Sequence, residues 1–532
     1  MKLSDFNPIG TTLQLIAGDA ITKDDLVEVS ALTGKVYPVE VSDYSAVPTV
    51  TYGTAQTSTA TGEIVATTYI VLGNTLAYAR QQVLVNDTDK SIYTLTNHLI
   101  ANGLLLTRFT PNGDILFSVD IDATATAYNN HHMFYLSNGN IAVVAMSSTS
   151  YYYAIYDTSL NVVTAKTTSA ETCLAAGRLS AIALSGGGFA VVFQQLTNPL
   201  LSRLATYDNA GAIVLAATTI WTRTGTTGPQ YHKIEQLSSG NIVVAVSSAN
   251  TVASIGLFHG IVTTGGVSVL AFTNLDTTSA ALLPELSILT GYYCIARKEN
   301  GTVNASVFNN AGTIQGAETS TVSSTSVNEN FAKLVNNSVD TFWLLCPSAT
   351  PAKTVLVKIP ITGTNYVTTA VQATGTLYDC HIDAFYDDGF IICTSTPRVS
   401  ASAPVLWIVD TTTGLLVTAS ATTFGSMPGS YLADSIRVIY GGTGVFICVY
   451  AAAATGPYTA LVVGKYANTA IIGVAGASAN EGSLVPIYQS AGAYKINELL
   501  GSTNKSFDNN TTTQCYGNKG TMIRNSVVLR GI

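Results

Sequence analysis

One pattern of hydrophobic and polar positions recurs along most of the chain. A hydrophobic residue precedes a short turn rich in Ser, Asn and Gly, and a strongly apolar run follows. The clearest copies span 136–144, 184–192 and 237–244, and weaker copies start at Ile288, Val335, Tyr386 and Tyr440. Successive starts lie 48, 53, 51, 47, 51 and 54 residues apart. A period of this length indicates similar structural units stacked side by side.

A second pattern keeps step with the first. An alternating run ends in a hydrophobic residue and a polar loop, and another β-rich run follows. Copies begin at Tyr156, Tyr207, Phe308 and Val409, and an additional copy begins at Phe109, ahead of the first turn motif. Loops of Asn, Asp and Gly between β-rich runs are hairpin turns, because Asn and Gly adopt positive φ at little cost. Each unit is therefore predicted to be a four-stranded antiparallel meander.

The second strand of each unit is apolar on both faces, as in 141–144, 189–192, 242–244 and 390–393. Such a strand needs a packing partner on each side. A ring of meanders stacked face to face supplies these partners and leaves few free edges. No segment of ten or more residues shows helical periodicity with caps. The predicted fold class is all-β, with a β-propeller of four-stranded blades.

The pattern allows seven blades or eight, and we favour seven. Seven turn motifs are present, and the early hairpin at 105–119 would pair with the last turn unit at 440–450 to close a seven-bladed ring. Alternatively, residues 458–472 complete the last blade and residues 66–82 supply strands for a first one. That arrangement gives eight blades.

The two ends of the chain depart from the repeat. Residues 10–42 contain Ala17-Gly18-Asp19, Leu26-Val27-Glu28-Val29 and Gly34-Lys35-Val36-Tyr37-Pro38-Val39. Residues 468–500 contain Ile471-Ile472-Gly473-Val474-Ala475, Glu481-Gly482 and Val485-Pro486-Ile487. This pattern resembles small β-barrel modules of tailed-bacteriophage virion proteins, which occur in capsid decoration proteins and in attachment regions of fibre and tail proteins. The resemblance implies one small β-barrel, formed from the N- and C-terminal segments, into which the propeller is inserted.

The predicted domain organisation follows from these patterns. Residues 1–43 and 468–500 are the two halves of the terminal barrel or attachment module, and residues 66–467 are the propeller. Residues 44–65 form a linker by composition. Residues 501–532 are a C-terminal arm, which either orders against a neighbouring subunit or forms a surface loop.

Composition narrows the function classes. Hydrophobic residues make up 47% of the 532 residues, but charged residues make up only 11%, against roughly 25% in an ordinary soluble domain. Such a surface is hydrated by hydroxyls and amides, which suits a rigid particle component. The net charge of -8 and the absence of a basic run argue against nucleic-acid binding. No apolar run reaches the roughly 18 residues of a membrane helix, and residues 1–8 do not resemble a secretory signal.

Histidines and carboxylates are the first candidates for chemistry. His131, His232 and His381 each lie five residues before a turn motif, so we expect them on innermost strands beside the central channel. Converging imidazoles could bind a cation, although a shared polar residue at a strand start is the simpler interpretation. Carboxylates for glycoside hydrolysis are sparse: Asp383, Asp387 and Asp388 in one blade, and Glu285 and Glu329 elsewhere. Asp387 and Asp388 precede Gly389 and more simply form a tight turn.

Other candidates also have simpler structural interpretations. Asp87 and Asp89 could bind calcium, but the twelve-residue ligand pattern is missing. The run 151–153 of three tyrosines could stack on sugar rings, or it could be a strand. Gly186–Gly188 lack a following helix and predict a hairpin turn rather than a phosphate site. The cysteines in apolar runs (Cys294, Cys346, Cys393 and Cys448) are expected to be buried and unpaired.

We therefore expect a non-enzymatic structural component of a bacteriophage particle, most plausibly a tail or fibre protein, located in the virion after synthesis in the bacterial cytoplasm. No catalytic, cofactor-binding or metal-binding residue is assigned, and no cofactor is expected. Expected partners are other virion proteins, further copies of the chain (a trimer first, a hexamer second), and a host surface glycan if the propeller faces the receptor. The alternative is a propeller that binds or degrades polysaccharide. It predicts carboxylates or histidines converging on the channel mouth.

Overall fold

The structure is a computed structural model of the whole chain. It describes residues 12–16, 26–30, 36–38, 65–72, 82–97, 104–110, 115–122, 130–146, 149–174, 179–223, 230–248, 256–275, 284–299, 302–316, 319–323, 332–349, 352–363, 367–370, 380–387, 389–397, 405–412, 422–423, 430–431, 436–442, 445–454, 456–465, 469–475, 484–488, 493–494, 521–523 and 526–528. All regular elements in these ranges are β-strands.

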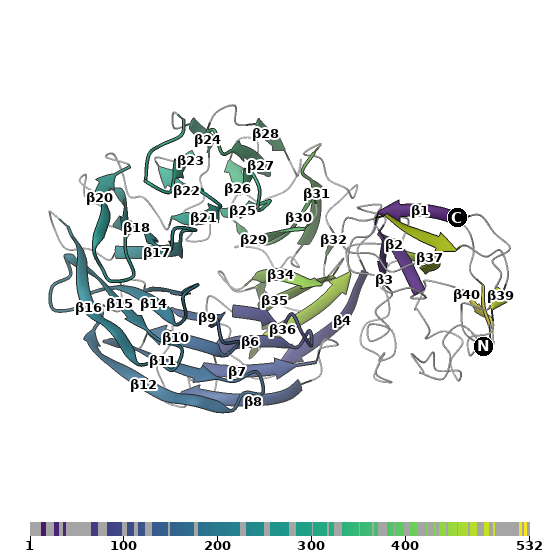
Figure 1. Cartoon of the computed structure of the whole chain (residues 1–532), viewed down its shortest axis with the longest axis horizontal. Helices are drawn as coiled ribbons and strands as arrows, with labels where there is room; N and C mark the ends of the chain where they lie inside the picture. Colours follow the sequence, from purple (N-terminus) through teal and green to yellow (C-terminus); the bar gives the residue numbers. More distant parts are fainter. Residues whose placement is uncertain are drawn as a thin grey trace.

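Within the described residues, eight antiparallel sheets form the blades of a β-propeller (Figure 1). The first four blades are β5 (Gln82–Val85), β6 (Ile92–Asn97), β7 (Leu104–Phe109) and β8 (Ile115–Asp122); β9 (His131–Tyr135), β10 (Ile141–Met146), β11 (Ser150–Tyr156) and β12 (Val162–Thr172); β13 (Ser180–Ala183), β14 (Phe189–Gln194), β15 (Leu201–Tyr207) and β16 (Ile213–Thr222); and β17 (Gln230–Gln236), β18 (Ile242–Ser248), β19 (Leu257–Val262) and β20 (Ser268–Asn274).

Three further blades have the same meander order. They are β21 (Glu285–Leu289), β22 (Tyr292–Glu299), β23 (Thr302–Asn309) and β24 (Thr319–Ser323); β25 (Lys333–Asn336), β26 (Thr341–Ala349), β27 (Ala352–Pro360) and β28 (Val367–Ala370); and β29 (Cys380–Asp387), β30 (Phe390–Pro397), β31 (Val405–Asp410) and β32 (Thr422–Thr423). The eighth blade contains β33 (Ser430–Tyr431), β34 (Arg437–Gly442), β35 (Val445–Ala454) and β36 (Gly456–Lys465), and its outermost strand is β4 (Val65–Leu72).

The ring closes in two ways between its first and last blades. The early strand β4 pairs with β36, with Ile70 opposite Leu461, so the chain start completes the last sheet. Phe109 of the first blade packs in one cluster with Ile447 and Val449 of the last. The innermost strands contact each other in sequence around the axis, and β34 contacts β5. The propeller class is confirmed, and the preferred count of seven blades is corrected to eight, the count of the alternative. That alternative is wrong in one respect, because β4 completes the last blade and does not supply a first one.

The turns show why the two sequence patterns recur. At the first motif, the Leu136 N–H donates to the Asn140 carbonyl at 2.8 Å, and the same bond joins Leu237 to Asn241. Gly139 has a φ of 84° at this turn, which glycine adopts without strain. At the second motif, the carboxylate of Asp157 accepts the backbone N–H groups of Ser159 and Asn161, both at 2.8 Å. The side chains of Asp208 and Asn309 accept in the same way, so these polar residues hold the hairpins closed.

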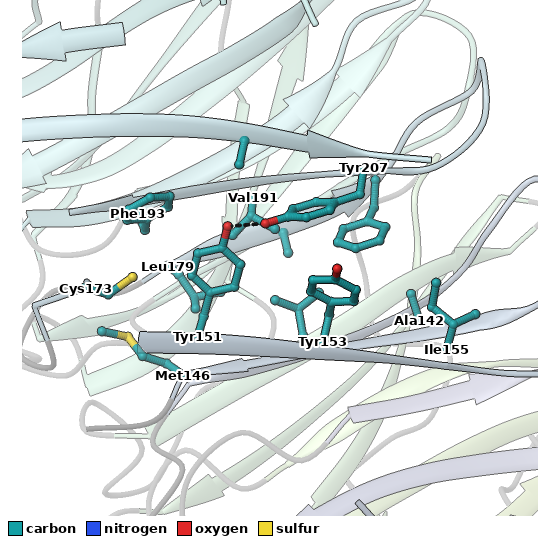
Figure 2. Close-up of a cluster of buried hydrophobic side chains, with 14 of the residues drawn as sticks. Ala142, Met146, Tyr151, Tyr153, Ile155, Cys173, Leu179, Val191, Phe193 and Tyr207 are labelled. Carbon is teal, nitrogen blue, oxygen red and sulfur yellow. Dashed lines mark hydrogen bonds between the residues drawn. The ribbon is translucent and has the colours of Figure 1, made fainter. Parts of the chain in front are cut away.

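The core lies between neighbouring blades. All six residues of β10 and all six of β14 are buried, as expected for strands that pack on both faces. Between the second and third blades, Phe189 stacks on Tyr207 with ring centroids 4.7 Å apart. The hydroxyls of Tyr151 and Tyr207 hydrogen-bond at 2.5 Å inside the same cluster (Figure 2). These two buried hydroxyls satisfy each other, which removes the cost of burying either one unpaired.

The two ends of the chain meet in one sheet outside the ring. Strands β1 (Thr12–Ile16), β2 (Leu26–Ser30) and β3 (Val36–Pro38) combine with β37 (Thr469–Ala475) and β38 (Leu484–Tyr488) in the order β1-β38-β37-β2-β3 (Figure 1). Strands β39 (Ala493–Tyr494), β40 (Thr521–Ile523) and β41 (Ser526–Val528) form a separate small sheet. Of the predicted linker 44–65, Val65 is the first residue of β4 and residues 44–64 lie outside the described residues; the other domain boundaries stay predictions. No helix in the described part of the chain is long and apolar enough to span a membrane.

The shared terminal sheet predicts the outcome of a single chain cut. If a protease site is inserted in 46–64 and cleaved, the N-terminal fragment should remain bound, because β1 pairs with β38 and β2 pairs with β37. Native size-exclusion chromatography should show one species and a denaturing gel two fragments. Elution of the N-terminal fragment as a separate species would refute the pairing. Uncut protein carrying the same insertion is the control.

Candidate axial binding site

A cavity of about 390 Å³ lies where the eight innermost strands converge. Its lining includes one polar side chain from each blade, and these eight residues are called the axial ring. Each pairs with the fourth or fifth residue of the second strand of its blade, so they lie at one level along the axis. The axial ring consists of Gln82, His132, Ser180, Lys233, Glu285, Lys333, Asp383 and Arg437.

Charge alternates around five consecutive members of the axial ring. Lys233, Glu285, Lys333, Asp383 and Arg437 come from the fourth to the eighth blade in that order. Three cations face two carboxylates, so the lining carries a formal charge of +1 in a chain whose net charge is -8. The remaining three members are uncharged donors and acceptors. The cavity therefore has a charged half and a neutral polar half.

One ion pair ties three blades together inside this ring. Lys333 Nζ lies 2.8 Å from Asp383 Oδ1, and Asp383 Oδ2 accepts the Val438 N–H at 2.9 Å. Burial acts to lower the pKa of Lys333, but the negative charges of Asp383 and Glu285 raise it above its usual value. Lys333 is therefore held charged, and Asp383 has both oxygens engaged.

Glu235 lies two residues beyond Lys233 on the same strand. Burial raises the pKa of its carboxyl, and the charge of Glu285 acts in the same direction, whereas Lys233 and Lys333 oppose the rise. The negative charge of Glu235 is thus disfavoured relative to that of a solvent-exposed glutamate. This carboxyl can hold a proton at a higher pH than an ordinary glutamate does.

His131 and His232 lie on innermost strands and line the same cavity, and one of them also links two blades. His232 Nε2 hydrogen-bonds Ser202 Oγ of the preceding blade at 2.9 Å, and burial lowers the pKa of His232 to about 3. His131 is buried at the equivalent position of β9, but His381 is displaced by one residue in strand register, opposite Thr396. Its side chain lies outside the described part. Among the described residues, no three His, Cys, Asp or Glu side chains are placed to hold a metal.

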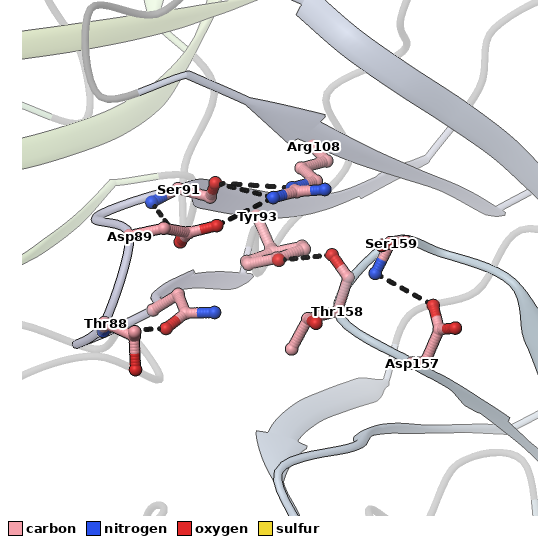
Figure 3. Close-up of polar contacts among 9 residues, drawn as sticks. Thr88, Asp89, Ser91, Tyr93, Arg108, Asp157, Thr158 and Ser159 are labelled. Atoms are coloured by element: carbon pink, nitrogen blue, oxygen red, sulfur yellow. Dashed lines mark hydrogen bonds and ion pairs between the residues drawn. The ribbon is translucent and has the colours of Figure 1, made fainter.

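Asp89 forms an ion pair instead of a calcium site. Its Oδ2 lies 2.7 Å from Arg108 Nη2, and its Oδ1 accepts the Ser91 N–H at 2.9 Å (Figure 3). Partial burial acts to raise the pKa of Asp89, but the hydrogen bonds from Ser91 and the charge of Arg108 lower it overall. The carboxylate is therefore already neutralised by a cation of the same blade.

The other structural interpretations also hold. The tyrosines at 151–153 are at most 5% exposed, so they cannot present a sugar-stacking surface. Gly389 has a φ of 92° in the turn after β29, whereas Asp388 and Glu329 lie outside the described residues. Gly188 has a φ of 79°, and a Cβ there would lie 1.9 Å from the Tyr207 carbonyl oxygen. The four cysteines predicted to be buried are buried and free, as is Cys173.

Sequence reasoning selected Glu285 and Asp383 but missed the cations between and beside them. His132, Ser180 and Lys233 lie four residues before the turn leucines Leu136, Leu184 and Leu237. In later blades the same count fails, because the turns differ in length: Asp387 pairs directly with Phe390, whereas Tyr135 pairs with Ile141. Each axial-ring residue is a polar residue at the same register position of its innermost strand. This regularity is found only when the innermost strands are aligned by the residues they pair with, and not by distance from the turn.

No protein-family model matches the chain, and no curated protein matches it. Solved structures similar to it include the Dos1 propeller, at 10% identity and a TM-score of 0.46, covering 76% of this chain and 95% of that one. A puromycin hydrolase matches at 13% identity and a TM-score of 0.40, over 70% of this chain and 58% of that one. The polysaccharide lyase Uly1 matches at 10% identity and a TM-score of 0.38, covering 85% of this chain and 100% of that one. These likenesses concern the fold alone.

The expectation that the chain is not an enzyme is contradicted. Solved structures similar to it include a hydrolase and a polysaccharide lyase, so a propeller fold gives no ground for excluding catalysis. Carboxylates that could converge on the channel were sparse in the sequence, but Glu285 and Asp383 line one cavity together with three cations.

Removing the cation of the central ion pair should destabilise the ring. Lys333→Met leaves the Asp383 carboxylate, only 5% exposed, without its countercharge. We expect a loss of about 2 kcal/mol in the free energy of unfolding, below the cost for a fully buried pair, because Lys333 is partly solvated. Chemical denaturation measures it. Asp383→Asn added to Lys333→Met should recover part of the loss, and no recovery would contradict direct coupling. Arg108→Met, which breaks the more exposed pair with Asp89, should cost less.

The buried imidazole of His232 should make stability depend on pH. Because its folded pKa is about 3 and an unfolded histidine titrates near 6.5, the unfolded chain binds the extra proton between these values. Stability should be complete above pH 6.5 and fall as the pH drops toward 3, by about 1.4 kcal/mol per pH unit from this group. The His232→Gln variant lacks this pH-dependent loss of stability. The difference between its thermal unfolding temperature and that of the unmodified protein should therefore change as the pH is lowered. Parallel curves at all pH values would refute it.

Proposed function

We propose that the chain is a structural component of a bacteriophage particle, a tail or fibre protein whose terminal sheet docks on the virion. The propeller then projects as a scaffold or host-receptor-facing head. One observation carries the proposal: β1 pairs with β38 and β2 pairs with β37. A single mount is thereby formed from both chain ends, in the segments that resemble phage attachment modules.

The surface of the propeller supports assembly into a larger particle. Apolar side chains are exposed at the start of the outermost strands in several consecutive blades, among them Phe117 at 52% exposure and Val214 at 70%. Contacts with further copies of the chain would cover such residues. A homo-oligomer, with a trimer as first choice and a hexamer as second, fits this role. Other virion proteins are the proposed partners of the terminal sheet.

The location of the protein tests this proposal. Phage particles produced by the genome that encodes the chain should contain it, and antibodies against the propeller should label one fixed structure in electron micrographs. A variant lacking residues 1–43 should fold its ring, because β4 is retained, but should be missing from purified particles. Mass spectrometry of gradient-purified particles measures both outcomes. Absence of the intact protein from particles would refute the proposal.

The axial ring favours a second candidate function, a propeller that binds or degrades polysaccharide. That alternative predicts carboxylates converging on the channel, and Glu285 and Asp383 do so. Incubating the purified chain with bacterial surface polysaccharides separates the two activities: a binder lowers their mobility in gel electrophoresis without generating new chain ends, and a degrading enzyme generates them.

A further inference from the structure

We propose that the axial cavity is a binding site for a sugar that carries a carboxylate, a hexuronic acid unit of a surface glycan. This inference deepens the proposed receptor-facing role and rests on it only for the biological source of the glycan. The volume of about 390 Å³ lies within the range of small-ligand pockets, about 300–1,000 Å³. It is the chemistry of the lining that selects the ligand class.

The first argument is the unneutralised positive charge. Lys333 is compensated by Asp383, but among the described residues neither Lys233 nor Arg437 forms an ion pair. To the described residues, the Arg437 guanidinium donates one bond, from Nη1 to the Ile436 carbonyl at 2.8 Å, and it has further donors. Partly buried cations without a partner are costly. A ligand carboxylate would offset that cost, and arginine is suited to bind it in a bidentate geometry.

The second argument is the position of the hydrogen-bonding groups around the same cavity. Glu285 is an acceptor on the charged side and has no hydrogen-bond partner among the described residues. Gln82, His132 and Ser180 supply neutral polar groups from the first three blades; His132 Nε2 also contacts the Leu179 carbonyl at 3.2 Å, and Ser180 Oγ accepts the Ile234 N–H at 3.3 Å. A simple inorganic anion would use the cations alone. A polyol with one carboxylate would use both halves, since its hydroxyls can donate to Glu285 and bond to the amide, imidazole and hydroxyl groups.

The third argument is an aromatic platform beside the cations. Phe385 and Tyr440 both line the cavity, and their rings meet edge to face with centroids 6.1 Å apart. Tyr440 is 41% exposed and lies on the same strand as Arg437. Apolar faces of pyranose rings stack on exposed aromatic rings. Because Arg437 and Tyr440 both line the cavity, it offers a cation and an aromatic ring to one bound sugar.

Methyl glucuronide and methyl glucoside are the probes, because they differ only in the carboxylate at C6. Isothermal titration calorimetry on the full chain should show at least tenfold tighter binding of the glucuronide. That preference should shrink as salt is raised, because the contact is between charges. Equal affinity for the two sugars, or no binding of either, would overturn the proposal. Displacement of the glucuronide by an equal concentration of inorganic phosphate would also overturn it, since the cavity would then be a general anion site.

Two variants and one control connect this binding to the cavity. Arg437→Gln and Lys233→Gln should each reduce glucuronide affinity at least tenfold while leaving the weaker glucoside affinity unchanged. Arg108→Gln removes a cation outside the cavity and should leave both affinities unchanged. Thermal unfolding verifies that each variant is folded, and two separate variants keep the test decisive if one is not. Unchanged glucuronide affinity in a folded Arg437→Gln protein would refute the assignment. Virion location is measured separately, so either proposal can fail alone.

Discussion

Closure of the ring is the constraint on which the rest of this structure depends. The second strand of a blade is apolar on both faces, as in β10 and β14, and only a neighbouring blade on each side removes both faces from water. The first and last blades obtain their missing neighbour from each other, through Phe109 packed with Ile447 and Val449. The β4–β36 ladder fixes this contact by making the beginning of the chain part of the last sheet. Both chain ends therefore leave the ring at the same blade, and they are close enough to build one terminal sheet.

Most of the fold could be predicted because each blade uses the same local features, and these repeat in the sequence. Apolar second strands, glycines at positive φ and Asp or Asn side chains that accept backbone N–H groups recur in step. The first blade escaped the count because its turn uses other residues for the same task. Lys90 takes the positive φ, at 55°, and the side chains of Asn86 and Asp89 accept the N–H groups of Thr88 and Ser91. With no Leu-Ser-Gly signature there, the eighth repeat was hidden from the pattern.

The candidate site was harder to predict because its residues are far apart in sequence and meet only in the closed ring. Glu285 and Asp383 could be selected as carboxylates, but nothing local indicated that they face one cavity. Counting back four residues from each turn motif reaches His132 but not Glu285 or Asp383, because the blades differ in turn length, with five residues between β9 and β10 and two between β29 and β30. Charge complementarity between neighbouring blades, as in Lys333 and Asp383, depends on how the innermost strands of separate sheets lie beside each other. A linear pattern does not contain it.

The supply of the outermost strand of the last blade by β4 has a consequence for biosynthesis. β4 leaves the ribosome before any other propeller strand, whereas its hydrogen-bonding partner β36 is the last propeller strand to emerge. Throughout translation of the intervening blades, β4 has an unpaired edge and the growing arc has an uncovered apolar face, the surfaces through which nascent chains aggregate. A chain that terminates early cannot remove either one. The chain must therefore be synthesised to the end of β36 before the propeller has no unpaired strand edge and no uncovered apolar face.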